Sequence, residues 1–478
     1  MSGKNCIILN NDSARNIAVN CLLAFERDRI HIQDALDSIF RRYEIDSRER
    51  RLAQELALGT CRRLITLDHL IGCHSKRPLR RIEPAVLQIL RVGLYQFIYL
   101  ERTPVFAAVH QAVQQVRAAG IRGADSFVNA VLRSVQRDID GPVTSDGPIR
   151  PRATLWLDEK NGCQFKTDFL PDASKNPVKH ISLALSYPPW LVTRWLKQFD
   201  EETVRSIFMA GNSRPVLTLR ANRLRGTASE LFERLSEQDI TARQSGSAIQ
   251  LQQSAAPRQL PGYEEGLFSV QDYTAMSVAP LLGTQPGERV LDLCAAPGGK
   301  TTHLAELMDN RGSIVACDIS GEKLTLIEQN CRRLGITIVE TCLADDLDNL
   351  IERDGGFDCV LVDTPCSNTG VLARRVEVRH WLKPAGLREL ARKQMELLKK
   401  AVRAAQGNAR ILYSTCSIDT LENESLIQDF LQENPSFHLL EEKLTLPRSF
   451  GPTCDTNQKS TEDIDYHDGG YVALLIEQ

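Results

Sequence analysis

The sequence predicts a multidomain protein in which an all-α N-terminal domain and a small α+β module precede a larger α/β domain. Three observations predict this fold class. Residues 12–140 show helical periodicity almost throughout, residues 181–264 mix short helices with strands, and from about residue 265 strands alternate with helices. A chain of 478 residues with 42% hydrophobic content can also bury more than one core.

The N-terminal domain, residues 1–140, is predicted to be helical. Apolar residues recur there at positions i, i+3, i+4 and i+7, as expected of amphipathic helices. The segments with this pattern are 14–25, 51–71, 85–100, 105–120 and 126–138. Pro84 and Pro104 stand near the starts of two of these helices, where the missing N–H of proline costs nothing.

Two further regions precede the α/β domain. Residues 141–180 are polar and irregular and contain several prolines, which indicates a linker or an insertion. Residues 181–264 predict two helices followed by strand, helix, strand and strand, with Arg220, Arg223 and Arg225 at the first strand. Such a module is either an RNA-binding platform or a spacer domain.

Residues 265–478 are predicted to form a mostly parallel, doubly wound sheet. The expected strands are 289–294, 313–318, 336–341, 357–363, 409–415 and 469–477. The expected helices are at about 300–308, 321–334, 387–406 and 421–433. Ligands of such sheets bind at the carboxyl ends of the strands.

Charge is distributed unevenly along the chain, although the net charge is only −3. Residues 12–140 contain 20 Lys and Arg against 15 Asp and Glu, with basic clusters at 41–42, 48–51 and 76–81. Residues 433–478 contain 3 basic and 9 acidic side chains. This pattern fits either a local nucleic-acid surface near the N-terminus or ordinary solvated helix faces.

Composition also argues against several classes of protein. The sequence has no apolar stretch of the length of a membrane span and no N-terminal secretion signal, so a cytoplasmic protein without membrane contact is expected. Its thirteen cysteines include no CxxC pair and no cluster with metal-ligand spacing, so neither a metal site nor a disulfide framework is expected. Most of these cysteines are therefore predicted to be small buried hydrophobic residues.

A glycine-containing loop follows the first strand of the α/β domain, in the segment LDLCAAPGGKT (291–301). Gly298 and Gly299 allow a tight turn and close approach of a ligand, and the following helix presents free N–H groups. Asp318, at the end of the next strand, can accept hydrogen bonds from ribose hydroxyls. A P-loop would need glycine in place of Cys294, and no GxGxxG motif is present, so S-adenosylmethionine is the expected ligand.

Two cysteines follow neighbouring strands, in the segments DTPCS (363–367) and YSTCS (413–417). Addition of a thiolate to C6 of a cytosine makes C5 nucleophilic enough to accept a methyl group, and a second thiol, a hydroxyl or a water can assist the later loss of the C5 proton. Asp363, if protonated, could donate to N3 of the base. Residue chemistry alone leaves open which of Cys366 and Cys416 attacks.

The motifs LDLCAAPGGKT, DTPCSNTGV and YSTCS resemble those of the Nol1/Nop2/Sun family of RNA cytosine-C5 methyltransferases. From about residue 12 to the C-terminus, apart from 141–180, the chain resembles the bacterial RsmB/Sun branch of that family. The resemblance implies a NusB-like helical RNA-binding domain (1–140), a linker or insertion (141–180), a small α+β RNA-binding module (181–264) and a Rossmann-like S-adenosylmethionine-dependent catalytic domain (265–478). The family's usual Pro-Asp is missing before Trp381.

The resemblance also implies roles for individual residues. Cys416 is expected to be the nucleophile and Cys366 to assist release, with Asp363 as a third catalytic group. The residues expected to contact S-adenosylmethionine are Cys294, Ala295, Ala296, Pro297, Gly298, Gly299, Lys300, Asp318, Asp345 and Asp363. The implied substrate is one cytosine of 16S (small-subunit) ribosomal RNA, and the protein is expected to be monomeric.

Three alternatives remain open at this point. The protein could be an RNA-binding or antitermination factor with a vestigial catalytic domain, although both cysteines and the glycine loop are present. It could also apply the same chemistry to transfer RNA or to DNA. DNA cytosine-C5 methyltransferases use the Pro-Cys cysteine as nucleophile, so the additional Thr-Cys cysteine favours RNA.

Overall fold

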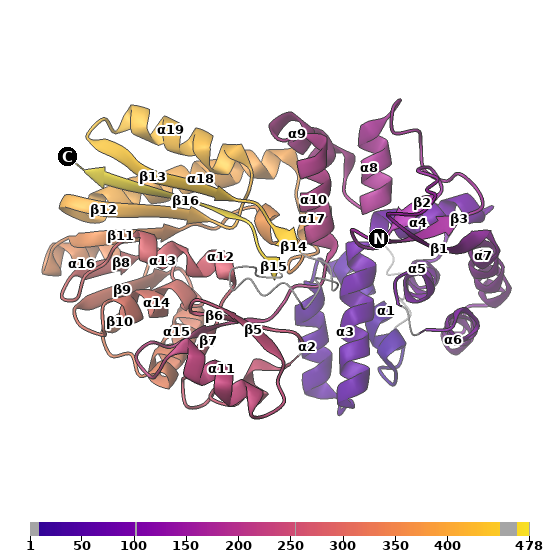
Figure 1. Cartoon of the computed structure of the whole chain (residues 1–478), viewed down its shortest axis with the longest axis horizontal. Coiled ribbons are helices and arrows are strands. Elements are labelled where there is room, and N and C mark those ends of the chain that lie inside the picture. The colour runs from indigo at the N-terminus through magenta and orange to yellow at the C-terminus, as the bar shows by residue number, and fades with distance from the viewer. Residues whose placement is uncertain (1–8, 101–102, 254, 450–465, 478) are drawn as a thin grey trace, which may run out of the picture. The chain divides into compact units, whose positions relative to one another are not determined.

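The computed structural model describes residues 9–100, 103–253, 255–449 and 466–477, and the chain divides into two compact units (Figure 1). Unit 1 consists of Met1–Ser213 together with Arg379–Trp381. Unit 2 consists of Arg214–Val378 and Leu382–Gln478. The finer domain boundaries expected from the sequence, at residues 140, 180 and 264, stay predictions.

Unit 1 is built mainly from helices, as the periodicity predicts. They are α1 (Ala14–Asp28), α2 (Ile32–Arg42), α3 (Ser47–Arg62), α4 (Leu64–His74), η1 (Leu79–Arg81), α5 (Pro84–Tyr99), α6 (Val105–Ala118) and α7 (Ala124–Asp138). Helix α5 is buried around most of its circumference because α1, α3, α4, α6 and α7 all pack against it. Pro84 is its first residue, and Pro104 directly precedes α6.

The segment predicted to be a linker or insertion is ordered. Strands β1 (Ile139–Thr144), β2 (Thr154–Trp156) and β3 (Asn161–Phe165) form an antiparallel sheet in the order β1-β3-β2. Helices α8 (Pro177–Leu185), α9 (Pro189–Gln198) and α10 (Glu201–Asn212) follow and complete unit 1. Prolines and turn residues hide these short strands in the sequence, because their apolar runs are too short to show a period.

Three residues of helix α17 (Val378–Trp381), Arg379–Trp381, belong to unit 1 although they are far from the rest of it in the sequence. Their contacts explain why. The buried guanidinium of Arg379 donates hydrogen bonds to Asn212 Oδ1 (2.7 Å), to the Gly211 carbonyl (2.8 Å) and to the Arg62 carbonyl (3.0 Å). Trp381 stacks on Phe25, with 5.3 Å between ring centroids. These residues lie where the sequence lacks the family's usual Pro-Asp.

Unit 2 begins with a small α+β part. Its four-stranded sheet has the order β5-β6-β4-β7, formed by β4 (Thr218–Ala221), β5 (Ala242–Ser245), β6 (Ala248–Leu251) and β7 (Phe268–Val270). Helix α11 (Ala228–Ser236) packs on this sheet and begins with a capping box between Thr227 and Glu230. Strand β7 was not predicted, and it pairs with β4 rather than with the larger sheet.

The larger sheet of unit 2 has seven strands in the order β10-β9-β8-β11-β12-β16-β13. The strands are β8 (Arg289–Asp292), β9 (Ser313–Asp318), β10 (Val339–Leu343), β11 (Phe357–Asp363), β12 (Ala405–Thr415), β13 (Phe437–Thr445) and β16 (Gly470–Glu477). The first five strands of this order are parallel, and β16 and β13 are antiparallel. This arrangement confirms the doubly wound sheet, to which the structure adds β13.

Helices cover both faces of this sheet (Figure 1). One core cluster joins the sheet to α16 (Leu347–Asp354), α18 (Pro384–Ala404) and α19 (Glu424–Glu433). The other joins it to α13 (Val278–Leu281), α14 (Gly299–Leu307) and α15 (Gly321–Leu334). Because both faces are buried, the central parallel strands are almost continuously apolar. The remaining elements of unit 2 are η2 (Pro257–Gln259), α12 (Tyr273–Met276), η3 (Thr369–Val371), η4 (Thr420–Glu422), β14 (Arg448–Ser449) and β15 (Tyr466–His467).

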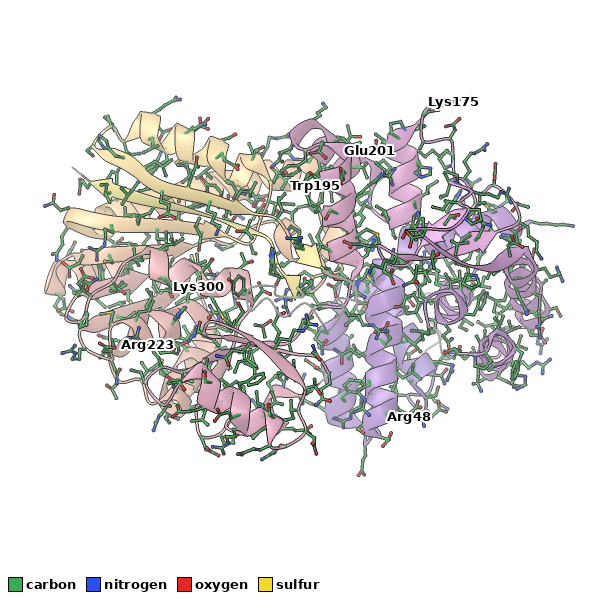
Figure 2. The ribbon with its side chains drawn as sticks, in the orientation of Figure 1. Arg48, Lys175, Trp195, Glu201, Arg223 and Lys300 are labelled. Carbon is green, nitrogen blue, oxygen red and sulfur yellow. The ribbon has the colours of Figure 1, made fainter. Side chains whose placement is uncertain are left out.

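A buried ion pair connects the small sheet to α14. Arg220 and Glu306 are each 1% exposed, and their charged groups lie 2.6 Å apart. Arg220 also donates to the Gly299 carbonyl (2.8 Å). Arg220 therefore cannot belong to an RNA-facing surface, although Arg223 remains exposed (Figure 2).

We expect Glu306→Gln to reduce the free energy of unfolding by about 3–5 kcal/mol, because the buried charge of Arg220 loses its counterion. Urea unfolding of the variant and the parent measures this change. The double variant Arg220→Met/Glu306→Leu, which removes both charges, should recover most of the loss. A change below about 0.5 kcal/mol in the single variant, the level of an ordinary surface substitution, would contradict the role of this pair.

Candidate active site

The predicted site residues lie at the carboxyl ends of five parallel strands of unit 2, with Asp345 after β10. The glycine loop follows β8, Asp318 ends β9, and the two cysteine loops follow β11 and β12. Strands β11 and β12 are direct neighbours, with Asp363 paired in register to Ser414. Because parallel strands end at the same edge of a sheet, these loops converge on one site.

The conformation of the glycine loop depends on Gly298. Its φ of 96° is in the left-handed region, and a Cβ atom at this position would lie 3.2 Å from Ile327. Beneath the loop, the fully buried Asp292 accepts a hydrogen bond from Thr301 Oγ1 (2.7 Å). Burial raises the pKa of Asp292 to about 7. The loop and the start of α14 are thus held by a carboxyl group inside the core.

Two backbone N–H groups, one of them on the glycine loop, hold the carboxylate of Asp318. Its Oδ2 atom accepts a hydrogen bond from the Ala296 N–H (3.3 Å), and its Oδ1 atom accepts one from the Ser320 N–H (3.2 Å). The next side chain, Ile319, is 85% exposed. Asp345 lies in the exposed loop that follows β10.

These groups fit the parts of S-adenosylmethionine. A carboxylate at the end of β9 suits the ribose hydroxyls, the exposed apolar side chain of Ile319 suits one face of an adenine ring, and the amino-terminal end of α14 suits a carboxylate. Cys294, Ala295, Ala296 and Pro297 belong to the loop that connects β8 to α14, and the Ala296 N–H of this loop donates to Asp318. The donor set therefore agrees with the cofactor expected from the sequence.

The thiols of Cys366 and Cys416 face each other, with their sulfur atoms 2.8 Å apart in a hydrogen bond. Both cysteines are free, and Cys366 is only 8% exposed. The hydrogen bond with Cys416, together with burial, raises the pKa of Cys366 well above its usual range. Cys366 is therefore protonated at neutral pH.

Asn368 contacts both cysteine loops. Its Oδ1 atom accepts a hydrogen bond from Cys416 Sγ (3.2 Å), and its Nδ2 donates to the Cys366 carbonyl (3.0 Å). The residue has a φ of 59°, a left-handed conformation that asparagine tolerates better than most residues. Asn368 stands within the DTPCSNTGV motif, but nothing in the sequence indicated this contact.

Lys300 and Asp363 form an ion pair at the rim of the site. Lys300 is the second residue of α14 (Figure 2). Its Nζ lies 2.7 Å from Asp363 Oδ2, and Ser414 Oγ donates to Asp363 Oδ1 (2.7 Å). Burial alone would lower the pKa of Lys300, but the charges of Asp363 and Cys416 raise it. Both carboxyl oxygens of Asp363 therefore accept hydrogen bonds, one from Lys300 and one from Ser414.

Glu422, which was not predicted, joins the two cysteine loops from below. Its side chain is fully buried and accepts hydrogen bonds from the Ser367 N–H (2.8 Å), the Ser367 hydroxyl, the Ser417 hydroxyl (2.7 Å) and Gln394 Nε2 (2.9 Å). Ser367 and Ser417 directly follow the two cysteines. In a single sequence, an acidic residue six positions after Cys416 carries no signal of this role.

The backbone of Gly370, on the loop after β11, contacts two other segments. The Gly370 N–H donates to the Cys416 carbonyl (2.9 Å), and the Gly370 carbonyl accepts from the Gly469 N–H (2.8 Å). A Cβ atom at position 370 would lie 2.8 Å from the Cys416 carbonyl oxygen. Only glycine allows this approach of three backbone segments.

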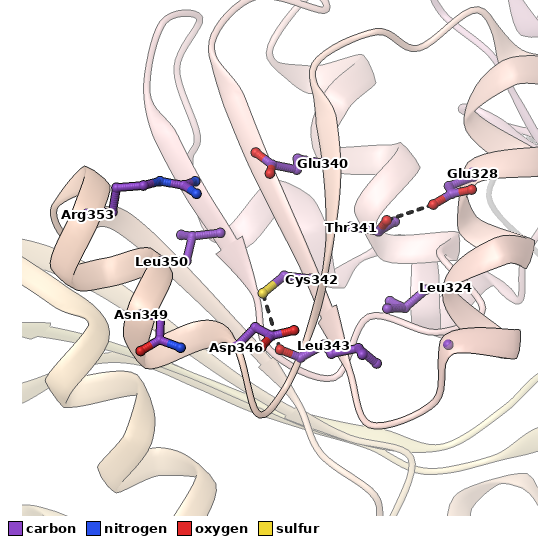
Figure 3. Close-up of a pocket in the computed structure, with 11 residues that line it drawn as sticks. Leu324, Glu328, Glu340, Thr341, Cys342, Leu343, Asp346, Asn349, Leu350 and Arg353 are labelled. Carbon is purple, nitrogen blue, oxygen red and sulfur yellow. Dashed lines mark hydrogen bonds between the residues drawn. The ribbon is translucent and has the colours of Figure 1, made fainter.

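A separate cavity of about 650 Å³ lies along the edge strand β10, between α15 and α16 (Figure 3). Its lining includes Glu328, Glu340, Thr341, Cys342 and Arg353. It contains none of the predicted site residues. This cavity is therefore separate from the candidate site at the strand ends.

Two further findings concern the described ranges of the chain. No group of three or more His, Cys, Asp or Glu side chains there could hold a metal ion. None of the helices in those ranges has the length and apolar character that crossing a membrane requires.

Comparison with known families supports the same three parts in the same order. Residues 12–137 match the NusB family, and residues 187–257 match the ferredoxin-like domain of RsmF/B-like methyltransferases. Residues 279–476 match the family described as 16S rRNA methyltransferase RsmB/F. These matches confirm the fold class predicted from the sequence.

Similar proteins extend this likeness to the whole chain. A probable ribosomal RNA small subunit methyltransferase B of Bacillus subtilis (strain 168) is 33% identical over 434 residues, which is 89% of each chain. Its counterpart in Synechocystis sp. is 31% identical over 97% of this chain and 99% of its own.

Solved structures share the fold as well. The crystal structure titled PH0851 covers 98% of this chain and 100% of its own, with a TM-score of 0.70 and 23% identity. A methyltransferase homologue from Pyrococcus horikoshii covers 63% of this chain and 99% of its own, with a TM-score of 0.51 and 26% identity. The motifs, the fold and the extent of these matches together confirm the resemblance seen in the sequence: the chain belongs to the RsmB/F family of 16S rRNA methyltransferases.

Proposed function

We propose that this protein methylates C5 of one cytosine in 16S ribosomal RNA, with S-adenosylmethionine as methyl donor and Cys416 as covalent nucleophile. The observation that carries the proposal is the facing pair of thiols 2.8 Å apart at the edge of a sheet whose neighbouring loops suit a nucleoside cofactor. The relatives' names refer to small-subunit ribosomal RNA, which supports this substrate over transfer RNA or DNA.

The two thiols differ in environment, and this difference supports separate roles. Cys366 is held protonated by Cys416 and by burial. The thiol of Cys416 donates to Asn368, and the ammonium of Lys300 is close enough to stabilise the thiolate that forms when this proton is lost. Cys416 is therefore the residue that adds to C6 of the cytosine.

Addition at C6 makes C5 electron-rich. S-adenosylmethionine, when bound, supplies the methyl group that C5 accepts. The Lys300–Asp363 pair stands beside the thiols and can donate a proton to N3 of the base, which stabilises the negative charge created by thiolate addition. This assignment places the proton on Lys300 rather than on Asp363.

Release requires loss of the C5 proton and elimination of the Cys416 sulfur. Once Cys416 is bonded to C6, its hydrogen bond to Cys366 is lost, and with it the largest contribution to the raised pKa of Cys366. Cys366 then ionises more easily and can accept the C5 proton, directly or through a water. Release thus becomes available only after the adduct has formed.

We propose that the segment Cys294–Lys300 and Asp318 hold the cofactor, with Asp345 as a further contact. Asp318 is supported by its backbone hydrogen bonds and by the exposed Ile319 beside it. Asp345 rests on the family resemblance and on its place in the loop after β10. The RNA-binding roles of residues 1–140 and 181–264, and a monomeric state, stay predictions.

Cys366→Ser should trap a covalent protein–RNA complex when incubated with 16S ribosomal RNA and S-adenosylmethionine, because the adduct forms but is released slowly. Cys416→Ser should form no such complex. Denaturing gel electrophoresis separates the complex from free protein. Cys359→Ser, at a buried cysteine of β11 away from the strand end, is a matched control and should turn over without trapping. Trapping by Cys416→Ser instead would reverse the two assignments.

Asp318→Asn should weaken binding of S-adenosylmethionine by about 10- to 100-fold, since a hydrogen bond to a charged group contributes about 1.5–3 kcal/mol. Isothermal titration calorimetry without RNA measures the affinity directly. Asp309→Asn, on the exposed loop after α14, makes the same chemical change outside the site and should bind as the parent does. Equal affinities for all three proteins would remove Asp318 from the cofactor site.

A further inference from the structure

Glu422 is a buried carboxylate whose partners come from both cysteine loops. Its side chain is 0% exposed, and within the described residues no Lys or Arg forms an ion pair with it. Its charge is instead met by a backbone N–H, two hydroxyls and the Gln394 amide. A buried charge that lacks any one of these donors would cost free energy, so the arrangement favours a single geometry.

The donors are placed where they control the thiols. Ser367 follows Cys366 on the loop after β11, and Ser417 follows Cys416 on the loop after β12. Their hydroxyls lie 3.1 Å apart and both contact Thr369 Oγ1. One carboxylate therefore binds the residue directly after each cysteine, and a movement of either loop would break a hydrogen bond to Glu422.

Charge is also arranged asymmetrically around the thiol pair. The negative charge of Glu422 is among the groups that raise the pKa of Cys366, after the hydrogen bond with Cys416, burial and the charge of Cys416. The positive charge of Lys300 is coupled instead to Cys416. The negative charge of Glu422 therefore opposes ionisation of Cys366, whereas the ammonium of Lys300 offsets negative charge at Cys416.

We propose that Glu422 is a positioning residue that holds the two cysteines in contact and keeps them unequal, so that Cys416 attacks and Cys366 is reserved for release. Glu422 touches neither the substrate nor the reacting atoms and acts through Ser367 and Ser417. This role rests on the proposed function, in which Cys416 attacks the cytosine and Cys366 assists release. The inequality of the two thiols is a property of the protein alone and can be tested without RNA.

The test compares Glu422→Gln with Glu424→Gln in site-resolved alkylation. Glutamine keeps the shape of the side chain: its oxygen can accept from Ser367 N–H and Gln394, and its amide can donate to hydroxyls that rotate to accept. Glu424 lies two residues further on, at the start of α19, and provides the matched control. Folded protein is treated with iodoacetamide from pH 6 to 10, and each cysteine is quantified by peptide mass spectrometry.

Loss of the carboxylate charge should lower the pH midpoint for alkylation of Cys366, because the thiolate is the reactive form. At a fixed pH below the midpoint, we expect Cys366 to react about 3- to 10-fold faster in Glu422→Gln, since one pKa unit changes the thiolate population about tenfold. Glu424→Gln should match the parent. An equal rise for both cysteines without a midpoint shift would indicate simple loosening and would overturn the proposal.

Ser417→Ala provides a second variant if Glu422→Gln does not fold. It removes one donor and keeps the carboxylate charge. It should therefore slow methyl transfer while leaving the midpoint of Cys366 in place, and a shifted midpoint would contradict the assigned role of the charge. Because alkylation needs neither RNA nor cofactor, a protein that methylates no RNA would refute the proposed function and still give a result for Glu422.

Discussion

The active site depends on the buried carboxylate of Glu422 and the donors that surround it. Adjacent parallel strands bring Cys366 and Cys416 to the same edge of the sheet, but each cysteine stands beyond the last residue of its strand, where the ladder no longer determines its position. The hydrogen bonds from Ser367 and Ser417 extend that control into the loops. Close backbone contact at Gly370 completes it.

The cofactor loop and the thiols form one connected site because Lys300 belongs to both. It is the second residue of the helix that follows the glycine loop, and its ammonium pairs with Asp363 at the end of β11. The same charge acts on Cys416. The buried pair between Arg220 and Glu306 holds the helix from its other side. In the proposed function, cofactor binding, protonation of the base and formation of the thiolate all depend on the position of this one helix.

Much of this organisation could be predicted from the sequence. Long periodic segments identified the helices of unit 1, and buried strands followed by Gly298, Asp318, Cys366 and Cys416 located the site. Short elements were missed: the β1-β3-β2 sheet, β7 and β13 have few residues or little apolar alternation, and their stability comes from partners distant in the chain. Glu422 was missed for a related reason, since it is 55 positions from its partner Ser367 in the sequence.

The position of Arg220 in the sequence was a poor guide to the environment of its side chain. A basic residue beside a strand suggested an RNA surface, but the side chain is buried in an ion pair with a residue 86 positions away. Neither hydropathy nor spacing distinguishes an exposed arginine from a buried one whose acidic partner is distant in the sequence and adjacent only in the folded protein. The same holds for Arg379, whose burial is explained by carbonyl and amide acceptors of unit 1.

The activity that we propose is transfer of a methyl group to C5 of a cytosine in 16S ribosomal RNA. The most direct measurement supplies S-adenosylmethionine with a labelled methyl group to total RNA from cells that lack the gene, followed by mass-spectrometric mapping of the labelled nucleotide. We expect label on 5-methylcytosine at one position of 16S ribosomal RNA, and none with Cys416→Ser. Label confined to transfer RNA, label on another atom, or no labelled RNA would contradict it.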